Sequence, residues 1–126
     1  MKVELPLGDV VDKITILLIK TVKISDASKL LNIRTELETL REAWAAAGHP
    51  ALESLSDWAG LNEVNGQLWD VEDDLRDLER DKDFGPGFVA LARSVYKLND
   101  RRASLKRSIN VALGSRLVEE KSYAAY

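Results

Sequence analysis

The stretch VYKLNDRRASL, residues 95–105, carries an arginine inside an otherwise apolar helical pattern. Apolar side chains recur around Arg102 in alternating steps of three and four, which is the spacing of one face of an amphipathic helix. This face comprises Phe88, Leu91, Val95, Leu98, Leu105, Ile109 and Ala112. The pattern therefore predicts a long helix that carries one guanidinium among its apolar residues.

Three further segments have helical spacing, and prolines separate them. Pro6, Pro50 and Pro86 each stand at a break in the apolar pattern, where a fixed φ and a missing N–H begin or end helices. We expect helices over residues 7–24, 26–47, 57–82 and 86–113, and a tail over residues 114–126. No segment shows the strict alternation of a half-buried strand. The sequence thus predicts an all-α fold: an antiparallel bundle of about four helices with a short C-terminal tail, in a single domain over residues 1–126.

The composition excludes several kinds of site. A chain of 126 residues with 45% hydrophobic content can bury one core. It has no cysteine and one histidine, which excludes disulfides and argues against a zinc site, so we expect no cofactor and no metal. The apolar run between Lys13 and Lys20 is far shorter than a membrane span. We therefore expect a soluble, cytoplasmic protein without a membrane-spanning segment.

Charge is distributed unevenly along the chain, although the net charge is only −3. Residues 51–83 carry three basic and eleven acidic side chains, and residues 87–126 carry eight basic and three acidic ones. Attraction between neighbouring helices is the simplest consequence of this asymmetry. No nucleic-acid partner is expected, because the basic residues of the last helix have no aromatic residues between them on their face.

A stripe of polar and aromatic residues runs beside the apolar faces of the third and fourth predicted helices. If these helices form a hairpin that turns near residue 85, Arg102 lies level with Leu68 and Trp69, one turn from Glu72. A buried guanidinium without a carboxylate is unfavourable, so we expect Glu72 to be its partner, with Asn65 or Asn99 supplying further hydrogen bonds.

Two interpretations of this stripe remain open. It is either a buried network that fixes the register of the helices, or a pocket that binds an anionic ligand. In the pocket, basic side chains would hold the anion and aromatic side chains would form an apolar wall. The candidate ligand-binding residues are Asn65, Trp69, Glu72, Arg76, Tyr96, Asn99, Arg102 and Lys106. No catalytic residue is assigned, because the chain offers no nucleophile paired with a base.

An enzymatic alternative rests on acidic residues of the third helix. One face of that helix carries Asp70, Asp73, Asp74 and Asp77. Carboxylates at this spacing hold Mg²⁺ in all-α nucleotide pyrophosphohydrolases, but such sites need a second acidic helix and a solvated acidic face is the simpler interpretation. A small mutase-like helical enzyme that acts on an anionic substrate is a further alternative.

Three features, two on the first predicted helix and one in the tail, suggest other contacts. If the first two helices form a hairpin, Asp12 lies level with Arg41 and an ion pair between them is plausible. Apolar Ile16 and Ile19 on the outer side of the first helix leave a homodimer possible. The tail can fold back on the bundle or dock on another chain.

Four stretches together resemble a known family: GDVVDKITILLIK (residues 8–20), NEVNGQLWDVEDDLR (62–76), FVALARSVYKLNDRRASLKRSIN (88–110) and LGSRLVEEKSY (113–123). The family consists of short, uncharacterised, bacterial all-helical proteins and is catalogued as a domain of unknown function. Its characteristic polar positions correspond here to Gly8, Asp12, Lys13, Thr15, Trp69, Glu72, Asn99, Arg102, Lys106 and the EEKSY tail. This chain departs from the family pattern at Pro6, where a capping serine is usual, and at Leu18, where glutamate is common.

The resemblance implies a cellular context. Family members occur beside or fused to glycosyltransferases in bacterial surface-polysaccharide loci, and no activity is established for them. The expectation is a non-catalytic accessory or binding module for glycan assembly. Its expected partners are a glycosyltransferase or another polysaccharide-assembly protein and an anionic sugar compound.

Overall fold

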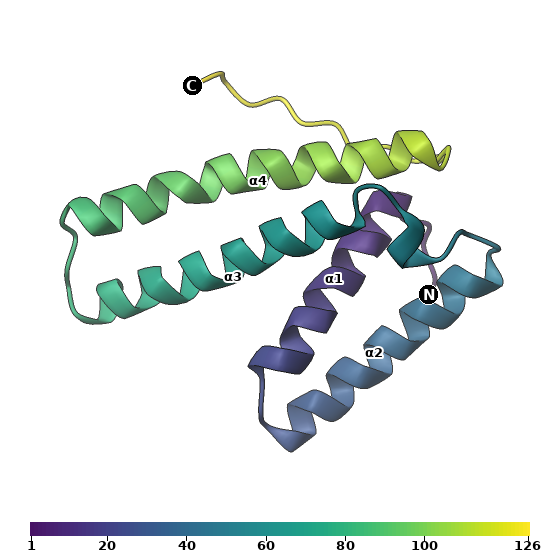
Figure 1. Ribbon diagram of the computed structural model, residues 1–126, viewed down its shortest axis with the longest axis horizontal. Helices are drawn as coiled ribbons and strands as arrows, with labels where there is room; N and C mark the ends of the chain where they lie inside the picture. Colours follow the sequence, from purple (N-terminus) through teal and green to yellow (C-terminus); the bar gives the residue numbers. More distant parts are fainter.

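The computed structural model describes residues 1–126 and contains helices and no strand (Figure 1). The elements are α1 (Leu7–Lys23), α2 (Ala27–Ala46), the short 3₁₀ turn η1 (Leu52–Ser54), α3 (Trp58–Arg80) and α4 (Pro86–Ala112). The all-α bundle prediction is confirmed, and every α-helix begins and ends within two residues of its predicted limits. None of the helices presents the uninterrupted apolar length that a bilayer crossing requires.

The helices form two antiparallel hairpins, α1–α2 and α3–α4 (Figure 1). Helix α1 packs against α2, α3 and α4, and it therefore joins the two hairpins. Contacts on several sides require apolar residues around much of the helix, and α1 has such a broad apolar surface. The far end of the α3–α4 hairpin extends beyond α1, where apolar residues such as Leu75 and Leu91 are only half-buried.

The core lies where α1 crosses the α3–α4 hairpin. Its fully buried members come from three helices: Val11, Ile14, Leu61, Val64 and Ile109. Burial of each such side chain contributes about 1.5–3 kcal/mol to the free energy of folding.

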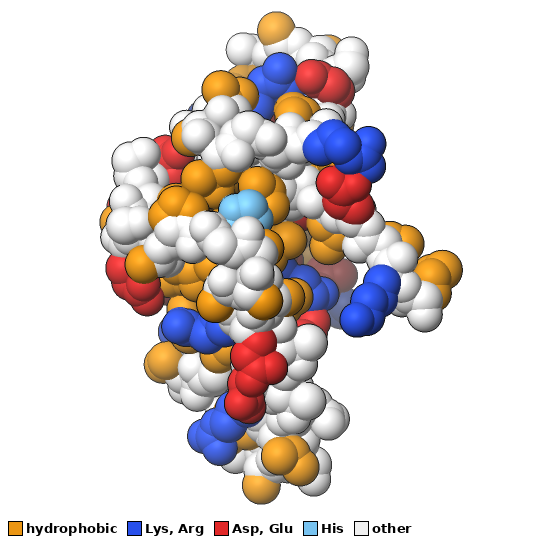
Figure 2. Space-filling view, turned by 90° about the vertical axis from the view of Figure 1, so that its right-hand side faces the viewer, with side chains coloured by type: hydrophobic (Ala, Val, Ile, Leu, Met, Phe, Trp, Pro, Cys, Tyr) orange, Lys and Arg blue, Asp and Glu red, His pale blue; other side chains and the backbone are white.

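A second part of the core closes the end of α2. Trp44 is buried and its indole N–H donates to the Pro50 carbonyl at 2.7 Å, which fixes the loop that leads into η1. The His49 ring lies 4.5 Å from the Trp44 ring, and Figure 2 shows this histidine among apolar side chains.

Local signals account for most helix ends. The Asp26 side chain accepts a hydrogen bond from the Lys29 N–H at 2.9 Å and caps α2. Pro86 opens α4, and Gly114 adopts a φ of 64° just after α4 ends.

The start of α1 lacks a local cap because Pro6 stands at the capping position. Distant residues replace it: the Leu7 N–H donates to the Ser115 hydroxyl at 3.1 Å, and the Gly8 N–H donates to the Asn110 side-chain oxygen at 2.6 Å. The first turn of α1 is thus fixed against the end of α4 and the beginning of the tail.

Candidate functional site

Arg102 of α4 is held by Asp12 of α1. Its Nε donates to Asp12 Oδ1 at 2.8 Å and its Nη2 donates to Asp12 Oδ2 at 2.5 Å, a bidentate arrangement. The Asp12 side chain is 6% exposed and that of Arg102 is 29% exposed. The hydrogen bonds that Arg102 donates to Asp12 raise the pKa of Arg102 above its ordinary value. The expectation that a carboxylate holds this guanidinium inward is correct, but the predicted partner, Glu72, is wrong.

The position of the hairpin turn explains the error. Helix α3 ends at Arg80 and α4 begins at Pro86, and Arg101 pairs with Glu63 at 3.6 Å. This alignment places Arg102 level with about Glu63, so Glu72 is roughly nine residues, or about 13 Å, farther along α3. Glu72 instead lies 3.8 Å from Arg76 in its own helix.

Asp12 is also bonded to α3, through Asn65. The Asn65 side-chain nitrogen donates to Asp12 Oδ1 at 2.9 Å and to the Thr15 hydroxyl at 2.8 Å. Asp12, Thr15 and Asn65 are all buried. The buried carboxylate thus accepts hydrogen bonds from two helices. A buried charge requires such partners, because its desolvation is otherwise uncompensated.

The predicted ion pair between Asp12 and Arg41 is wrong. Consecutive residues point about 100° apart around a helix, and Asp12 faces α3 and α4. Its neighbour Lys13 faces α2 and pairs there with Glu36 at 3.0 Å.

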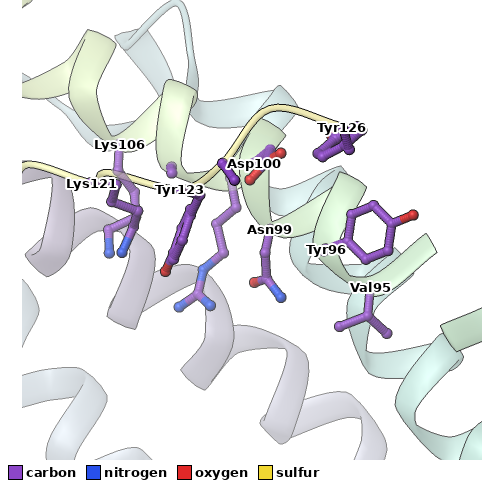
Figure 3. A pocket seen from close by; sticks show the side chains of 11 residues that line it. Val95, Tyr96, Asn99, Asp100, Lys106, Lys121, Tyr123 and Tyr126 are labelled. Atoms are coloured by element: carbon purple, nitrogen blue, oxygen red, sulfur yellow. The ribbon is translucent and has the colours of Figure 1, made fainter. Parts of the chain in front are cut away.

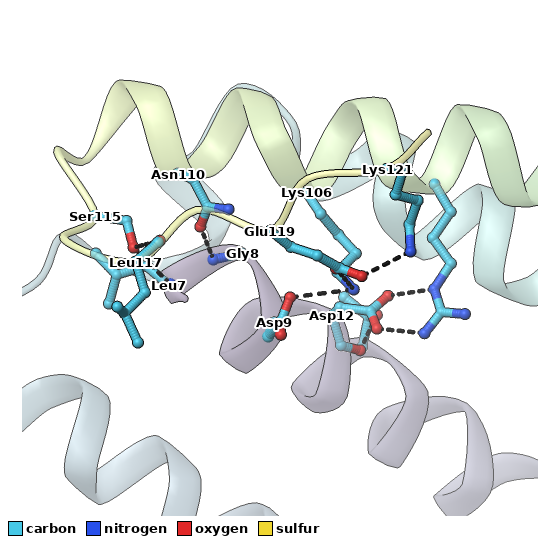
Figure 4. Close-up of polar contacts among 12 residues, drawn as sticks. Leu7, Gly8, Asp9, Asp12, Lys106, Asn110, Ser115, Leu117, Glu119 and Lys121 are labelled. Carbon is cyan, nitrogen blue, oxygen red and sulfur yellow. Dashed lines mark hydrogen bonds and ion pairs between the residues drawn. The ribbon is translucent and has the colours of Figure 1, made fainter. Parts of the chain in front are cut away.

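A second charged cluster lies one turn away, where the tail crosses α4 and α1 (Figure 4). Lys106 Nζ lies 3.4 Å from Glu119 Oε2, and Lys121 Nζ lies 2.6 Å from Glu119 Oε1. The hydrogen bond from Lys121 lowers the pKa of Glu119. Lys106 also lies 3.1 Å from Asp9 Oδ1, outside hydrogen-bonding geometry, so that buried oxygen has a charge partner but no donor.

The tail folds back along α4 (Figure 1). This is the first of the two arrangements expected for it from the sequence. Ser115 donates to the Leu117 carbonyl at 2.6 Å, and Arg116 pairs with Glu4 near the N-terminus. Leu117 is half-buried, whereas Val118 and Tyr123 remain exposed. Polar contacts therefore hold the tail more than apolar burial does.

A cavity of about 680 Å³ lies between α4 and the tail (Figure 3). We call it the tail cavity. Its polar and aromatic lining residues are Tyr96, Asn99, Asp100, Arg102 and Lys106 from α4, and Lys121, Tyr123 and Tyr126 from the tail. Its volume is within the range typical of sites for small molecules.

A smaller cavity of about 360 Å³, which we call the helix cavity, lies among α1, α3 and α4. Ile16 and Leu68 supply apolar walls. Asn99 and Arg102 line both cavities, so the two spaces meet at these residues.

The eight candidate residues are thus divided between two cavities. Tyr96 and Lys106 line the tail cavity alone, and Asn99 and Arg102 line both. The helix cavity alone has Asn65, Trp69, Glu72 and Arg76. The candidate ligand-binding residues did not include Lys121, Tyr123 or Tyr126. Lys121 and Tyr123 belong to the EEKSY motif that the family resemblance singled out, whereas no signal pointed to Tyr126.

The acidic face of α3 forms no metal centre. Asp70 pairs with Lys23 at 3.2 Å, and Asp77 pairs with Arg80 at 2.7 Å. No group of three or more histidine, cysteine, aspartate or glutamate side chains lies close enough to hold an ion.

Acidification is expected to release the tail. Hydrogen bonds from Arg116 and Lys121 lower the pKa values of Glu4 and Glu119, respectively. The pKa of a glutamate in the unfolded chain is about 4.3, and the pKa of these two glutamates is lower when the tail is docked. Their ionised carboxylates therefore stabilise the docked tail at pH values above about 4.3. This stabilisation is lost as the pH falls through the lower pKa of the docked state. NMR relaxation of residues 117–123 should show ordered amides at pH 7 and mobile amides near pH 3. A tail that stays ordered to pH 3 would contradict this assignment, and a Glu4→Gln, Glu119→Gln double variant should show the mobile tail already at pH 7.

Comparison with known proteins gives one match. A model of a family of unknown function, DUF6165, matches residues 1–126. No curated protein and no solved structure matches the chain. The assignment of a function therefore rests on the chain's own geometry.

Proposed function

This chain belongs to DUF6165, a family of unknown function, and we propose that it is a non-catalytic binding module that holds an anionic ligand in the tail cavity. The observation that carries the proposal is the convergence of Arg102, Lys106 and Lys121 on one cavity. Three cations at hydrogen-bonding range of a common space favour a phosphate-bearing or carboxylate-bearing ligand.

The cations keep capacity for a ligand although each has a partner. Arg102 uses Nε and Nη2 for Asp12, which leaves Nη1 for another acceptor. The partners also differ in their setting: Asp9 and Asp12 belong to helix α1, whereas Glu119 is exposed on the non-helical tail. Glu119 is therefore the carboxylate that an incoming anion would displace from the two lysines.

The proposal extends to the cellular role. The resemblance to bacterial proteins that accompany glycosyltransferases supports a cytoplasmic accessory role in surface-polysaccharide assembly. An anionic sugar compound and a glycosyltransferase are the corresponding ligand and protein partner.

Substitution of Lys106 tests the proposal. Isothermal titration with hexose phosphates and inorganic pyrophosphate should show binding that Lys106→Gln weakens at least about tenfold, because a hydrogen bond to a charged group contributes about 1.5–3 kcal/mol. Lys97→Gln is the matched control, since Lys97 is exposed on α4 and does not line the tail cavity. Absence of binding by the wild type, or equal losses in both variants, would refute the proposal.

The same titration includes two further readouts. Glu119→Gln should bind the anion several-fold more tightly than the wild type, because the competing carboxylate is removed while the Glu4–Arg116 and Arg107–Glu120 pairs still hold the tail. Phosphorus NMR of the titrated samples should show unchanged ligand; conversion to product would instead favour a small all-α enzyme that acts on the same anions.

A further inference from the structure

The tail cavity has a charged end and an aromatic end. Lys106 and Lys121 lie at one end, Tyr96 and Tyr126 lie at the other, and Asn99 lies between them (Figure 3). Ten residues of α4 separate Tyr96 from Lys106, which corresponds to roughly 15 Å along the helix axis. A ligand that fills the cavity is therefore elongated and has chemically different ends.

The aromatic end of the cavity is lined by exposed tyrosine rings. Tyr96 is 40% exposed and Tyr126 is 75% exposed, and their ring centroids lie 4.9 Å apart in an edge-to-face arrangement. Tyr123 is also largely exposed, but it lies toward the charged end, where Lys121 Nζ is 5.9 Å from the centroid of its ring (Figure 3). Exposed tyrosine rings that line a cavity favour a ligand with a planar ring, since stacking between an aromatic side chain and a base is favourable and tolerates any base.

The polar groups at this end fit the edges of such a ring. The Asp100 carboxylate, whose hydrogen bond with Tyr126 raises the pKa of that tyrosine, keeps lone pairs that can accept further hydrogen bonds, and the Asn99 amide can both donate and accept. A carboxylate at this end also disfavours a phosphate there, which directs the anionic part of a ligand toward the lysines.

From this arrangement we infer that the ligand is a nucleoside diphosphate or a compound that contains one, with its base against the tyrosines and its diphosphate against Arg102, Lys106 and Lys121. The inference rests on the proposed function, because the same cations hold the anion. A hexose phosphate carries its phosphate on a hydroxyl of the sugar and is too short to reach both ends. Ribose and diphosphate supply the spacing between a base and the lysine pair.

Comparison of ligands that share only part of this chemistry tests the inference. Isothermal titration should show that uridine diphosphate or adenosine diphosphate binds at least about tenfold more tightly than inorganic pyrophosphate. Loss of both rings in a Tyr96→Leu, Tyr126→Leu double variant should remove that advantage and leave pyrophosphate affinity unchanged. Phe84→Leu is the matched control, because Phe84 is an exposed aromatic residue at the α3–α4 turn, outside both cavities.

The outcomes separate the two proposals. Pyrophosphate binding equal to that of both nucleoside diphosphates would overturn the inference and leave the anion-binding function in place. Failure of all three compounds to bind would overturn both. An equal loss of nucleotide affinity in the Phe84→Leu control would also overturn the inference, whereas retained affinity there supports it. Circular dichroism would confirm that the exposed-residue variants are folded.

Discussion

Replacing Gly8 with alanine is expected to lower the free energy of unfolding by about 3 kcal/mol, the upper end of the usual cost of overpacking. A Cβ on Gly8 would overlap the carbonyl oxygen of Lys106 and lie 2.9 Å from its carbon. Both sides of this contact are helix backbone, so no side-chain rotation can relieve it. The first turn of α1 would have to move away from α4.

The same movement would break a buried hydrogen bond. Gly8 N–H donates to Asn110, whose side chain is almost completely buried. An unsatisfied buried amide by itself costs about 1–3 kcal/mol, which is why we expect the upper end of the overpacking range rather than its middle. Gly66→Ala is the matched control: Gly66 is helical, nothing lies within 4 Å of its added Cβ, and alanine there should stabilise the protein by about 0.5–1 kcal/mol. Urea denaturation of both variants checks the prediction. Equal midpoints would show that α1 and α4 do not approach this closely.

The helices could be predicted because their signals are local. Pro86, Gly114 and the Asp26 cap act within one turn of the residues that they affect. The η1 turn was not predicted, since three residues are too few to show a helical period. The apolar breadth of α1 indicated contacts on more than one side, but the residues that it meets depend on how the hairpins cross.

The site could be predicted only in part, for the same reason. Arg102 was identifiable because it interrupts an apolar face, and the need for a buried anion follows from its charge. Its actual partner, Asp12, lies ninety residues away on α1, and no spacing in the sequence connects them. Spacing could not predict which tail side chains line the cavity, because a segment without helical structure has no period that fixes which side chains face α4.

Replacing Arg102 with methionine is expected to lower the free energy of unfolding by about 3 kcal/mol, the lower end of the cost of breaking a buried ion pair. We take the lower end because the Arg102 side chain is 29% exposed. The variant leaves the Asp12 carboxylate buried with Asn65 as its remaining side-chain donor. Asp12→Asn should cost less, about 1–2 kcal/mol, because Arg102 can turn toward the cavities that it lines.

A double-mutant cycle measures the coupling. If the ion pair is the source of the loss, a variant that combines Asp12→Leu with Arg102→Met removes both charges and should be more stable than Arg102→Met alone. Additive losses in thermal and urea denaturation would show that the two side chains act independently. A milder loss in Arg102→Met than in Asp12→Asn would contradict the assignment of Asp12 as the more deeply buried partner.

Arg102→Lys distinguishes a role in helix register from a role in ligand binding. A lysine keeps the charge but cannot form the bidentate pair, so stability should fall while the cavity stays cationic. If Arg102 contributes to the site through its charge, this variant should bind pyrophosphate more tightly than Arg102→Met does. Both affinities are measured at a temperature at which both variants are folded. If Arg102 serves register alone, the two variants should bind equally well, because the charge would then have no part in holding the anion.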